Sequence, residues 1–345
     1  MSGGVDSSVA AALLIKQNHN VTGTTLLLYD STETEKSIYD AKKVSEILGI
    51  SHTILDFRQE FKKYVLDYFV REYINARTPN PCIICNKFIK FGFMLDKALK
   101  LGYDFVATGH YAQIKYNNIE KIWMLKKSNF MKDQSYFLYK LDQNQLKHII
   151  FPLENLTKPE VRDLAKKYNL PVSEKKDSQD ICFIKGQNYK KFIKNYNNFQ
   201  EYINNSLKSG DFIDIDNNCL GTHKGFMNYT IGQRKKLEIS LGKRIYVTKI
   251  NSKTNEVTLG DYCDGAKKCV TCTDFNFVNK KIIYNSQIFA KLRSVSKLIP
   301  CKIFFLENNM IQVILEQELY FPAPGQSIVF YDNFGYVLGG ATIFG

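Results

Sequence analysis

Two hydrophobic periods alternate over residues 1–110 of the chain. Apolar residues at helical spacing predict helices over Ser7–Lys16, Ser37–Leu48 and Gln59–Ile74. Short apolar runs between these segments predict strands over Val21–Tyr29, His52–Leu55 and Phe105–Thr108. Strands that are separated by helices indicate a parallel sheet with crossover helices, so we expect an α/β domain at the N-terminus.

Turn and capping residues delimit further elements. Two prolines in Thr78-Pro79-Asn80-Pro81 exclude a helix and predict a fixed loop. A hairpin turn is expected near Tyr116-Asn117-Asn118. Thr157 and Glu160 have the spacing of a capping box before a helix that ends near Tyr168.

The pattern changes after residue 205. Short alternating runs of Gly, Thr, Val, Ile and Tyr replace the long helical patterns and predict β-rich structure, including a small barrel. The chain is also too long for one ordinary core. We therefore expect an α/β domain over residues 1–200, a small β-rich domain over 205–260 and a β-barrel over 261–345.

Composition and charge narrow the class of protein. The chain has 345 residues, of which 44% are hydrophobic and 23% charged, a balance typical of globular proteins. It contains no apolar run that could span a membrane and no secretory signal, so we expect a cytoplasmic protein with no membrane partner. The net charge of +13 indicates a polyanionic partner or a general bias toward Lys, Asn and Ile, with equal weight.

A Gly-rich segment opens the first predicted helix. It reads Ser2-Gly3-Gly4-Val5-Asp6-Ser7-Ser8. Glycines let the backbone approach a phosphate, and a helix N-terminus offers free N–H groups. The lysine of the common P-loop is absent, so γ-phosphoryl transfer is not expected. Asp6 is positioned to cap the helix or to help hold Mg²⁺.

The whole segment resembles the PP-loop of the ATP pyrophosphatases, which split ATP into AMP and pyrophosphate. The resemblance implies an adenine nucleotide α-hydrolase-like domain. In that family a strand precedes the loop, whereas here Met1 stands directly before Ser2. We therefore expect either a start assigned too late or a truncated chain.

Eight cysteines occur without a secretory context, so metal binding or catalysis is expected before a disulfide scaffold. Cys82 and Cys85 form a CxxC pair, which is compatible with zinc, redox or cluster chemistry. Lysines stand close in sequence and would lower thiol pKa values, namely Lys87, Lys90, Lys175 and Lys176. A second CxxC pair, Cys269 and Cys272 with Cys263 nearby, is read as incidental surface cysteines, with structural zinc as the alternative. Cys219 and Cys301 are read as small apolar residues.

Six further segments resemble, in order, the motifs of the tRNA-specific 2-thiouridylases. They are Thr78-Pro79-Asn80-Pro81 with Cys85-Asn86-Lys87, Ala107-Thr108-Gly109-His110-Tyr111, Lys132-Asp133-Gln134-Ser135-Tyr136-Phe137-Leu138, Lys176-Asp177-Ser178 with Ile181-Cys182-Phe183-Ile184, Tyr229-Thr230-Ile231-Gly232-Gln233-Arg234-Lys235, and Pro324-Gly325-Gln326. The resemblance runs from residue 2 to about residue 341.

This resemblance implies a set of site residues. Catalytic roles fall on Cys85 as nucleophile, Cys182 as persulfide carrier and Asp6. ATP contacts are implied for Ser2, Gly3, Gly4, Val5, Asp6, Ser7, Ser8, Leu26 and Gly109. Contacts with tRNA are implied for Asn80, Pro81, Cys82, Lys132, Asp133, Gln134, Arg293 and Ser294. The family usually carries Arg-Tyr at the last pair, so Ser294 lacks the stacking ring, and Lys291 is a further candidate on the same strand.

The implied reaction is thiolation of the wobble uridine in the tRNAs for Lys, Glu and Gln. ATP with Mg²⁺ would adenylate the 2-oxygen, and sulfur from a Cys182 persulfide would replace it. Cys85 would release that sulfur and leave a Cys85–Cys182 disulfide. The sulfur would come from a relay protein or a cysteine desulfurase, and the enzyme would be a monomer.

Three alternatives remain. Cys82 stands where many members carry Asp, so Cys82, Cys85 and Cys182 are also candidates to hold a [4Fe–4S] cluster. A different PP-loop ligase would need no paired cysteines. Because the strand that precedes the loop in the family is not seen in this sequence, a catalytically impaired homologue that only binds tRNA is the third alternative.

Overall fold

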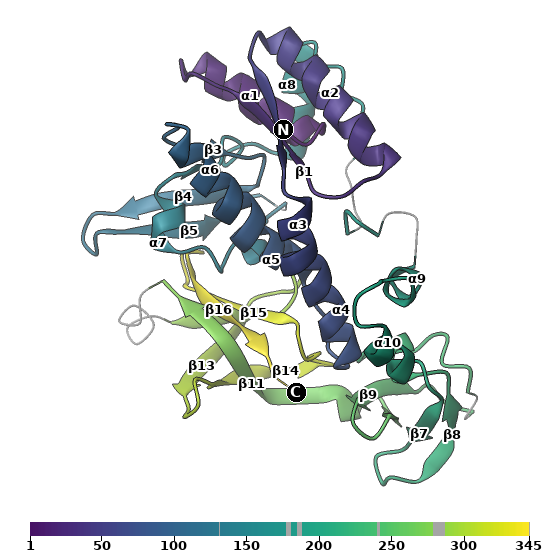
Figure 1. Cartoon of the computed structure of the whole chain (residues 1–345). Helices are drawn as coiled ribbons and strands as arrows, with labels where there is room; N and C mark the ends of the chain where they lie inside the picture. The colour runs from purple at the N-terminus through teal and green to yellow at the C-terminus, as the bar shows by residue number, and fades with distance from the viewer. Residues whose placement is uncertain (131, 177–180, 185–187, 240–241, 279–286, 345) are drawn as a thin grey trace. The chain divides into compact units, whose positions relative to one another are not determined.

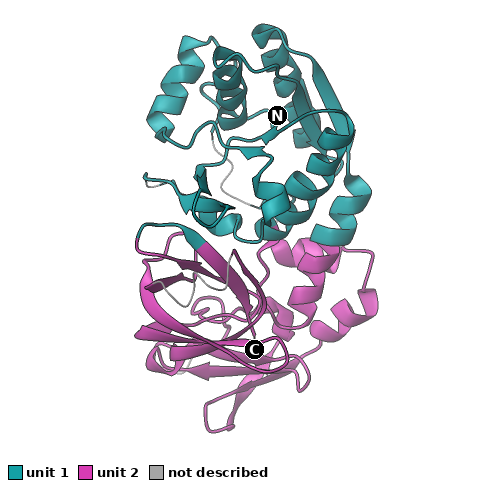
Figure 2. Cartoon of the chain, turned by 90° about the vertical axis from the view of Figure 1, so that its left-hand side faces the viewer, with its two compact units in different colours: residues 1–65, 82–183, 334–337 teal, residues 66–81, 184–333, 338–345 magenta. Residues whose placement is uncertain are grey.

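The computed structural model describes residues 1–130, 132–176, 181–184, 188–239, 242–278 and 287–344. Asp177, Ser178, Gln179 and Asp180, which belong to the second cysteine motif, lie outside the described residues. The chain forms two compact units (Figure 2). Unit 1 comprises residues 1–65, 82–183 and 334–337, and unit 2 comprises residues 66–81, 184–333 and 338–345.

Unit 1 contains helices and short parallel strands, labelled in Figure 1. Its helices are α1 (Val5–Lys16), α2 (Thr32–Leu48), α3 (Arg58–Phe61), the π-helical η2 (Cys85–Phe93), α6 (Met94–Lys100), the 3-10 turn η3 (Ser135–Phe137), α7 (Gln143–Leu146) and α8 (Lys158–Lys167). Its strands are β1 (Gly23–Leu27), β2 (His52–Asp56), β3 (Val106–Ala107), β4 (Ala112–Asn117), β5 (Ile122–Lys127) and β6 (Ile149–Ile150). The π-helical η1 (Lys62–Leu66) and α5 (Pro81–Ile84) contain the points where the chain passes between the units.

Parallel pairing in unit 1 confirms the α/β class. Among the described strands, β1 pairs with β2 and β3 pairs with β6, both in parallel. β4 and β5 form the expected antiparallel hairpin, with Asn117 in register with Ile122. Met1 lies beside β1, where its amino group donates to the Thr24 carbonyl and its own carbonyl accepts from the Thr25 hydroxyl.

Local signals set most helix boundaries. α8 begins at the predicted capping box, in which the Thr157 side chain accepts from Glu160 N and the Glu160 carboxylate accepts from Thr157 N. α1 begins at Val5, two residues before the predicted start, because Gly4 serves as the N-cap. α2 starts at Thr32 rather than Ser37, because Ser31 caps it.

The predicted helix over Gln59–Ile74 forms as one continuous helical run that contains a π-helical segment. α3 passes into η1 and then into α4 (Asp67–Ile74). The buried residues Phe61, Val65 and Phe69 recur at every fourth position. That spacing exceeds the 3.6 residues of an α-helical turn, and the wider π turn accommodates it.

Unit 2 carries α4, a small mixed region and a closed barrel (Figure 1). The mixed region consists of α9 (Tyr189–Lys194), α10 (Gln200–Ser206), the 3-10 turn η4 (Phe226–Asn228) and a sheet of order β8 (Cys219–His223), β7 (Gly210–Ile213), β10 (Glu256–Gly260), β9 (Tyr246–Asn251). The turn η5 (Cys263–Gly265) leads into the barrel. The barrel strands, in order around the closure, are β11 (Ala266–Phe277), β14 (Ile311–Tyr320), β13 (Ile299–Phe305), β12 (Ile288–Lys291), β15 (Ser327–Tyr331) and β16 (Val337–Ile343).

The barrel interior corrects two cysteine assignments. Cys272, read from the sequence as a surface residue, is fully buried in the barrel core, because inward and outward positions alternate along β11. Cys301 is buried in the same core, as expected. Cys219, which was read as a small apolar residue, is exposed. Cys263 and Cys269 are exposed, as predicted.

Candidate nucleotide and thiol site

The segment Ser2–Ser8, the candidate nucleotide loop, takes its conformation from its glycines and serines. Gly3 has a φ of +64°, and a Cβ there would lie 2.4 Å from the Ser37 carbonyl oxygen, so only glycine fits. The Ser7 and Ser8 hydroxyls both donate to the Gly4 carbonyl, at 3.1 and 2.9 Å. Gly4 caps α1 without a side-chain hydrogen bond, and the first N–H groups of such a helix are the groups that bind anions.

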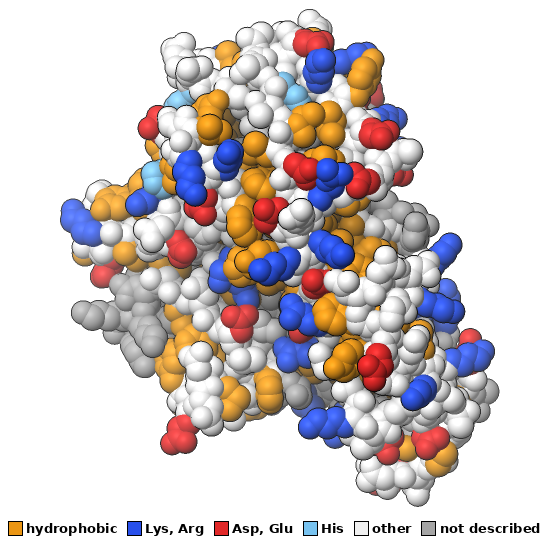
Figure 3. All heavy atoms as spheres, in the orientation of Figure 1, with side chains coloured by type: hydrophobic (Ala, Val, Ile, Leu, Met, Phe, Trp, Pro, Cys, Tyr) orange, Lys and Arg blue, Asp and Glu red, His pale blue; other side chains and the backbone are white. Residues whose placement is uncertain are grey.

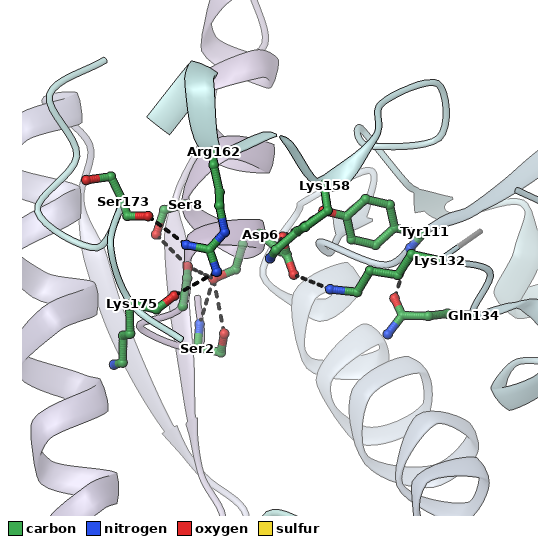
Figure 4. Close-up of polar contacts among 12 residues, drawn as sticks. Ser2, Asp6, Ser8, Tyr111, Lys132, Gln134, Lys158, Arg162, Ser173 and Lys175 are labelled. Carbon is green, nitrogen blue, oxygen red and sulfur yellow. Dashed lines mark hydrogen bonds and ion pairs between the residues drawn. The ribbon is translucent and has the colours of Figure 1, made fainter. Parts of the chain in front are cut away.

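Asp6 is the polar centre of the loop (Figure 4). Its Oδ1 accepts from the Tyr111 hydroxyl at 2.8 Å and from Lys158 Nζ at 2.6 Å, and its Oδ2 lies 3.5 Å from Lys132 Nζ. The Lys132 ammonium also lies 4.9 Å from the centre of the Tyr111 ring. The carboxylate is therefore balanced by two cations from distant parts of the chain.

Gly109 lies just after β3 and contacts the loop backbone. A Cβ on Gly109 would lie 2.7 Å from the carbonyl carbon of Asp6 and 2.8 Å from Ser7 N. Because these are backbone atoms, no side chain can be added without moving the start of α1. Leu26 lies near the carboxyl end of β1, the end at which ligands bind in parallel sheets.

His110 follows Gly109 and packs against two aromatic rings. Its ring centre lies 5.8 Å from Phe91 and 5.7 Å from Phe151, and its Nδ1 lies 2.8 Å from the Thr108 hydroxyl. Burial, assisted by the charge of Lys90, lowers the pKa of His110 well below its ordinary value. His110 is therefore neutral at physiological pH.

A third lysine, Lys175, connects the loop to the segment before Cys182, which Arg162 contacts (Figure 4). Lys175 Nζ donates to the Gly3 carbonyl at 2.8 Å and to Asp40 Oδ2 at 2.7 Å. Arg162 on α8 donates to the carbonyls of Ser173 and Lys175, at 2.9 and 3.1 Å. This short segment is thus held against the nucleotide loop.

The thiols of the predicted site lie in the same unit as the loop. Cys85 is buried at the start of η2, whereas Cys82 and Cys182 are exposed. The Tyr29 hydroxyl donates to the Cys182 carbonyl at 2.6 Å. Burial raises the pKa of Cys85 to about 12, negative charge on Cys182 or Cys82 would raise it further, and Lys90 lowers it. The structure therefore places Cys85 and Cys182 in the same compact unit as the loop.

The cluster alternative for Cys82, Cys85 and Cys182 stays a prediction. Over the part of the chain that the structure describes, no group of three His, Cys, Asp or Glu side chains lies close enough to hold a metal ion. Among the described residues, Cys263, Cys269 and Cys272 likewise form no group that could hold a zinc ion. The Cys85–Cys182 disulfide stays a prediction.

The tRNA-contact candidates of unit 1 are engaged within the unit. Asp133 accepts from the backbone N–H groups of Ser128 and Ser135. Gln134 Oε1 accepts from Tyr111 N, and Gln134 N donates to the Tyr111 carbonyl. Together with Lys132, these residues form a turn beside the nucleotide loop, and their contact with tRNA stays a prediction.

The remaining tRNA-contact candidates are distributed over both units. Asn80 and Pro81 belong to unit 2, and Cys82 begins a segment of unit 1. In unit 2, Thr78 N donates to the Pro324 carbonyl at 2.7 Å and Gln326 Nε2 donates to the Thr78 carbonyl at 3.0 Å. The Pro-Gly-Gln motif thus holds the proline loop.

Arg293 is exposed, and Ser294 is half-buried. They lie in a turn just after β12, where the Ser296 hydroxyl accepts from Arg293 N. No described contact tests their role.

Sequence reasoning missed Lys158, Tyr111 and Arg162 as site residues. Tyr111 and Lys158 contact Asp6 across 105 and 152 positions of the chain, respectively. The sequence signals were that Lys158 follows the capping residue Thr157 and that Tyr111 ends the Ala107–Tyr111 segment. The described residues also contain no helix long and apolar enough to cross a membrane.

Three family models cover the chain. A model described as the tRNA methyl transferase HUP domain matches residues 1–186. One described as the tRNA methyl transferase PRC-barrel domain matches residues 196–261, and one described as the aminomethyltransferase beta-barrel domain matches residues 267–343. Together with the loop on α1, these matches place the chain in the class of PP-loop proteins with two β-rich C-terminal domains.

Curated relatives define the family more closely. The tRNA-specific 2-thiouridylases MnmA of Acetivibrio thermocellus and Caldicellulosiruptor saccharolyticus are each 43% identical, over 99% of this chain and 97% and 96% of their own lengths. The chain belongs to the tRNA-specific 2-thiouridylase family. A solved structure described as the U34-tRNA thiolase NcsA from Methanococcus maripaludis with its [4Fe-4S] cluster is 26% identical over 53% of this chain and 58% of that one, with a TM-score of 0.35.

Proposed function

We propose that this protein is a tRNA-uridine 2-sulfurtransferase. The observation that carries the proposal is the presence, in one compact unit, of the Ser2–Ser8 loop at the start of α1 and of two thiols, Cys85 and Cys182. Family membership supports the same reaction. The proposed substrates are the wobble uridines of the tRNAs for Lys, Glu and Gln.

The first step is activation of the uridine by ATP. The 2-oxygen attacks the α-phosphorus, and the bond from that phosphorus to the bridging oxygen breaks, with its electron pair leaving on pyrophosphate. The loop from Ser2 to Ser8 binds the phosphates through its N–H groups, with Gly109 and Leu26 as further contacts. Asp6, a partly exposed carboxylate beside the phosphate position, is the residue that would hold Mg²⁺, an ion that offsets phosphate charge.

The second step is delivery of sulfur. Cys182 would carry a persulfide, received from a relay protein or a cysteine desulfurase. The Cys85 thiolate attacks Cys182 Sγ, the sulfur–sulfur bond breaks, and hydrosulfide departs with the electron pair. Hydrosulfide adds to C2 of the uridine and expels AMP, and a thiol reductant later reduces the Cys85–Cys182 disulfide.

Further parts of the proposal concern recognition and organisation. Asn80, Pro81, Cys82, Lys132, Asp133, Gln134, Arg293 and Ser294 are the proposed tRNA contacts. The domains are proposed to span residues 1–200, 205–260 and 261–345. The enzyme would act as a monomer in the cytoplasm.

The test measures AMP, pyrophosphate and 2-thiouridine in one reaction of protein, ATP, Mg²⁺, a persulfide donor and unmodified tRNA. We expect all three products from the natural protein. Cys182→Ala and Cys85→Ala should abolish 2-thiouridine, whereas Cys219→Ala, at an exposed thiol of unit 2, should leave it unchanged. The absence of all three products from the natural protein would contradict the proposal.

The alternatives predict other results. A different PP-loop ligase would keep its turnover in Cys182→Ala. A catalytically impaired homologue would bind tRNA without forming AMP. A [4Fe–4S] enzyme, purified without oxygen, would show a visible absorption band that disappears in Cys82→Ala.

A further inference from the structure

The nucleotide loop binds phosphate without a lysine of its own. In the common P-loop a lysine reaches the terminal phosphates and offsets their charge. Here the loop from Ser2 to Ser8 contains one charged residue, the acid Asp6. A loop that cleaves ATP needs positive charge where the leaving pyrophosphate develops its own negative charge.

Tertiary structure brings such a charge to the loop. Lys158 Nζ lies 2.6 Å from Asp6 Oδ1, and its side chain is only 18% exposed (Figure 4). Lys132 contacts the same carboxylate at 3.5 Å with a side chain that is 34% exposed. Lys158 is therefore the closer and the more enclosed of the two cations.

Packing fixes the position of Lys158. It is the first residue of α8, whose start is set by the Thr157–Glu160 capping box. Val161 and Ala165 on α8 are fully buried in one core cluster with Val5 and Val9 on α1. Since both helices belong to this cluster, the lysine is presented to the loop by a rigid element, which is how a catalytic charge is kept in place.

We propose that Lys158 binds the leaving pyrophosphate and supplies the charge that a loop lysine supplies elsewhere. This inference rests on the proposed adenylation. Without nucleotide the ammonium pairs with Asp6. Phosphate oxygens compete for it when ATP enters, and it stabilises the oxygen that receives the electron pair when the bond to the α-phosphorus breaks. The uridine N3 proton passes to water, and the lysine stays protonated throughout.

The experiment measures inhibition of the reaction by pyrophosphate and by AMP, each as an inhibition constant. In Lys158→Ala the constant for pyrophosphate should rise at least about tenfold, because a hydrogen bond to a charged group is lost. The constant for AMP should change less than about twofold, since AMP lacks the β- and γ-phosphates. The rate of AMP formation should fall about 100-fold, as for other transition-state charge contacts.

Two further variants complete the design. Lys158→Arg keeps the charge and should recover most of the pyrophosphate affinity. Lys166→Ala is the matched control, because Lys166 lies on the same helix with a side chain that is 60% exposed. Thermal unfolding of each variant verifies that it is folded.

Equal weakening of pyrophosphate and AMP in Lys158→Ala would overturn the proposal, because it would show that the lysine only supports the shape of the loop. Unchanged constants and rate would overturn it as well. If the natural protein itself forms no AMP with tRNA present, the proposed function fails. Direct calorimetric binding of pyrophosphate to the natural protein and to Lys158→Ala still tests the lysine, and equal affinities would reject its role.

Discussion

The environment of Cys85 decides how the sulfur chemistry can proceed at the scale of single residues. The side chain is buried, and burial raises the pKa of its thiol to about 12. Lys90 acts in the opposite direction and lowers that pKa. A thiol with a pKa this high is protonated at neutral pH, so it resists oxidation and must lose its proton before it can attack Cys182.

The pKa of Cys85 predicts its alkylation profile. Only the thiolate reacts, so the rate should rise about tenfold per pH unit from pH 7 to beyond pH 9, whereas free cysteine levels off near pH 8.5. Mass spectrometry of the Cys85 peptide after iodoacetamide treatment, in a Cys82→Ser background, measures this rate. Lys90→Met should slow the reaction further. A plateau near pH 8.5 would show that the thiol is not buried in solution.

The contact between β3 and α1 controls the site at the scale of elements. The strand ends at Ala107, and Gly109 directly after it contacts the backbone of Asp6 and Ser7. The same loop is bounded on its other side by α2, through the close approach of Gly3 to Ser37. The start of α1 is thus confined between two elements.

Gly109→Ala should therefore displace the nucleotide loop. A Cβ at 2.7 Å from a backbone atom forces a shift, and overpacking of this kind costs about 1–3 kcal/mol. We expect a lower melting temperature and weaker ATP binding, measured by scanning calorimetry and titration calorimetry. Gly4→Ala is the control for stability, because its φ is −106° and its nearest atom, Ser2 Oγ, lies 3.4 Å away. Equal melting temperatures for Gly109→Ala and the natural protein would contradict the close contact.

Charge is a property of the whole molecule. The chain carries a net charge of +13, and Figure 3 shows Lys and Arg side chains spread over the viewed face, interspersed with acidic ones. A distributed positive charge suits a ligand with a long phosphate backbone better than a compact anion. This favours tRNA as the polyanion over a bias of composition alone.

The affinity for tRNA should consequently depend on salt. If two or more phosphates are neutralised, raising the salt from about 50 to about 200 mM should weaken binding at least about tenfold. Fluorescence anisotropy with labelled, unmodified tRNA measures the slope of log affinity against log salt. A slope near zero would indicate that the charge has no part in binding. If the natural protein did not bind tRNA even at low salt, tRNA itself would be rejected as the partner.

Sequence reasoning succeeded where structure depends on neighbouring residues. The α8 capping box, the hairpin after Tyr116 and the parallel α/β class follow from local spacing and period, and the structure has all three. It failed where packing overrode the local signal. Cys272, read from the sequence as a surface residue, lies in the barrel core, because the direction of a side chain depends on strand register.

The sequence by itself determined the phosphate loop, the paired cysteines and the order of domain types, because short motifs and hydrophobic periods carry that information. Only the tertiary structure decided the charge at the loop. Lys158 reaches Asp6 across 152 positions of the chain, and the burial of Cys85 depends on its surroundings in the folded unit. Such contacts arise from the packing of whole elements, so spacing along the chain does not reveal them.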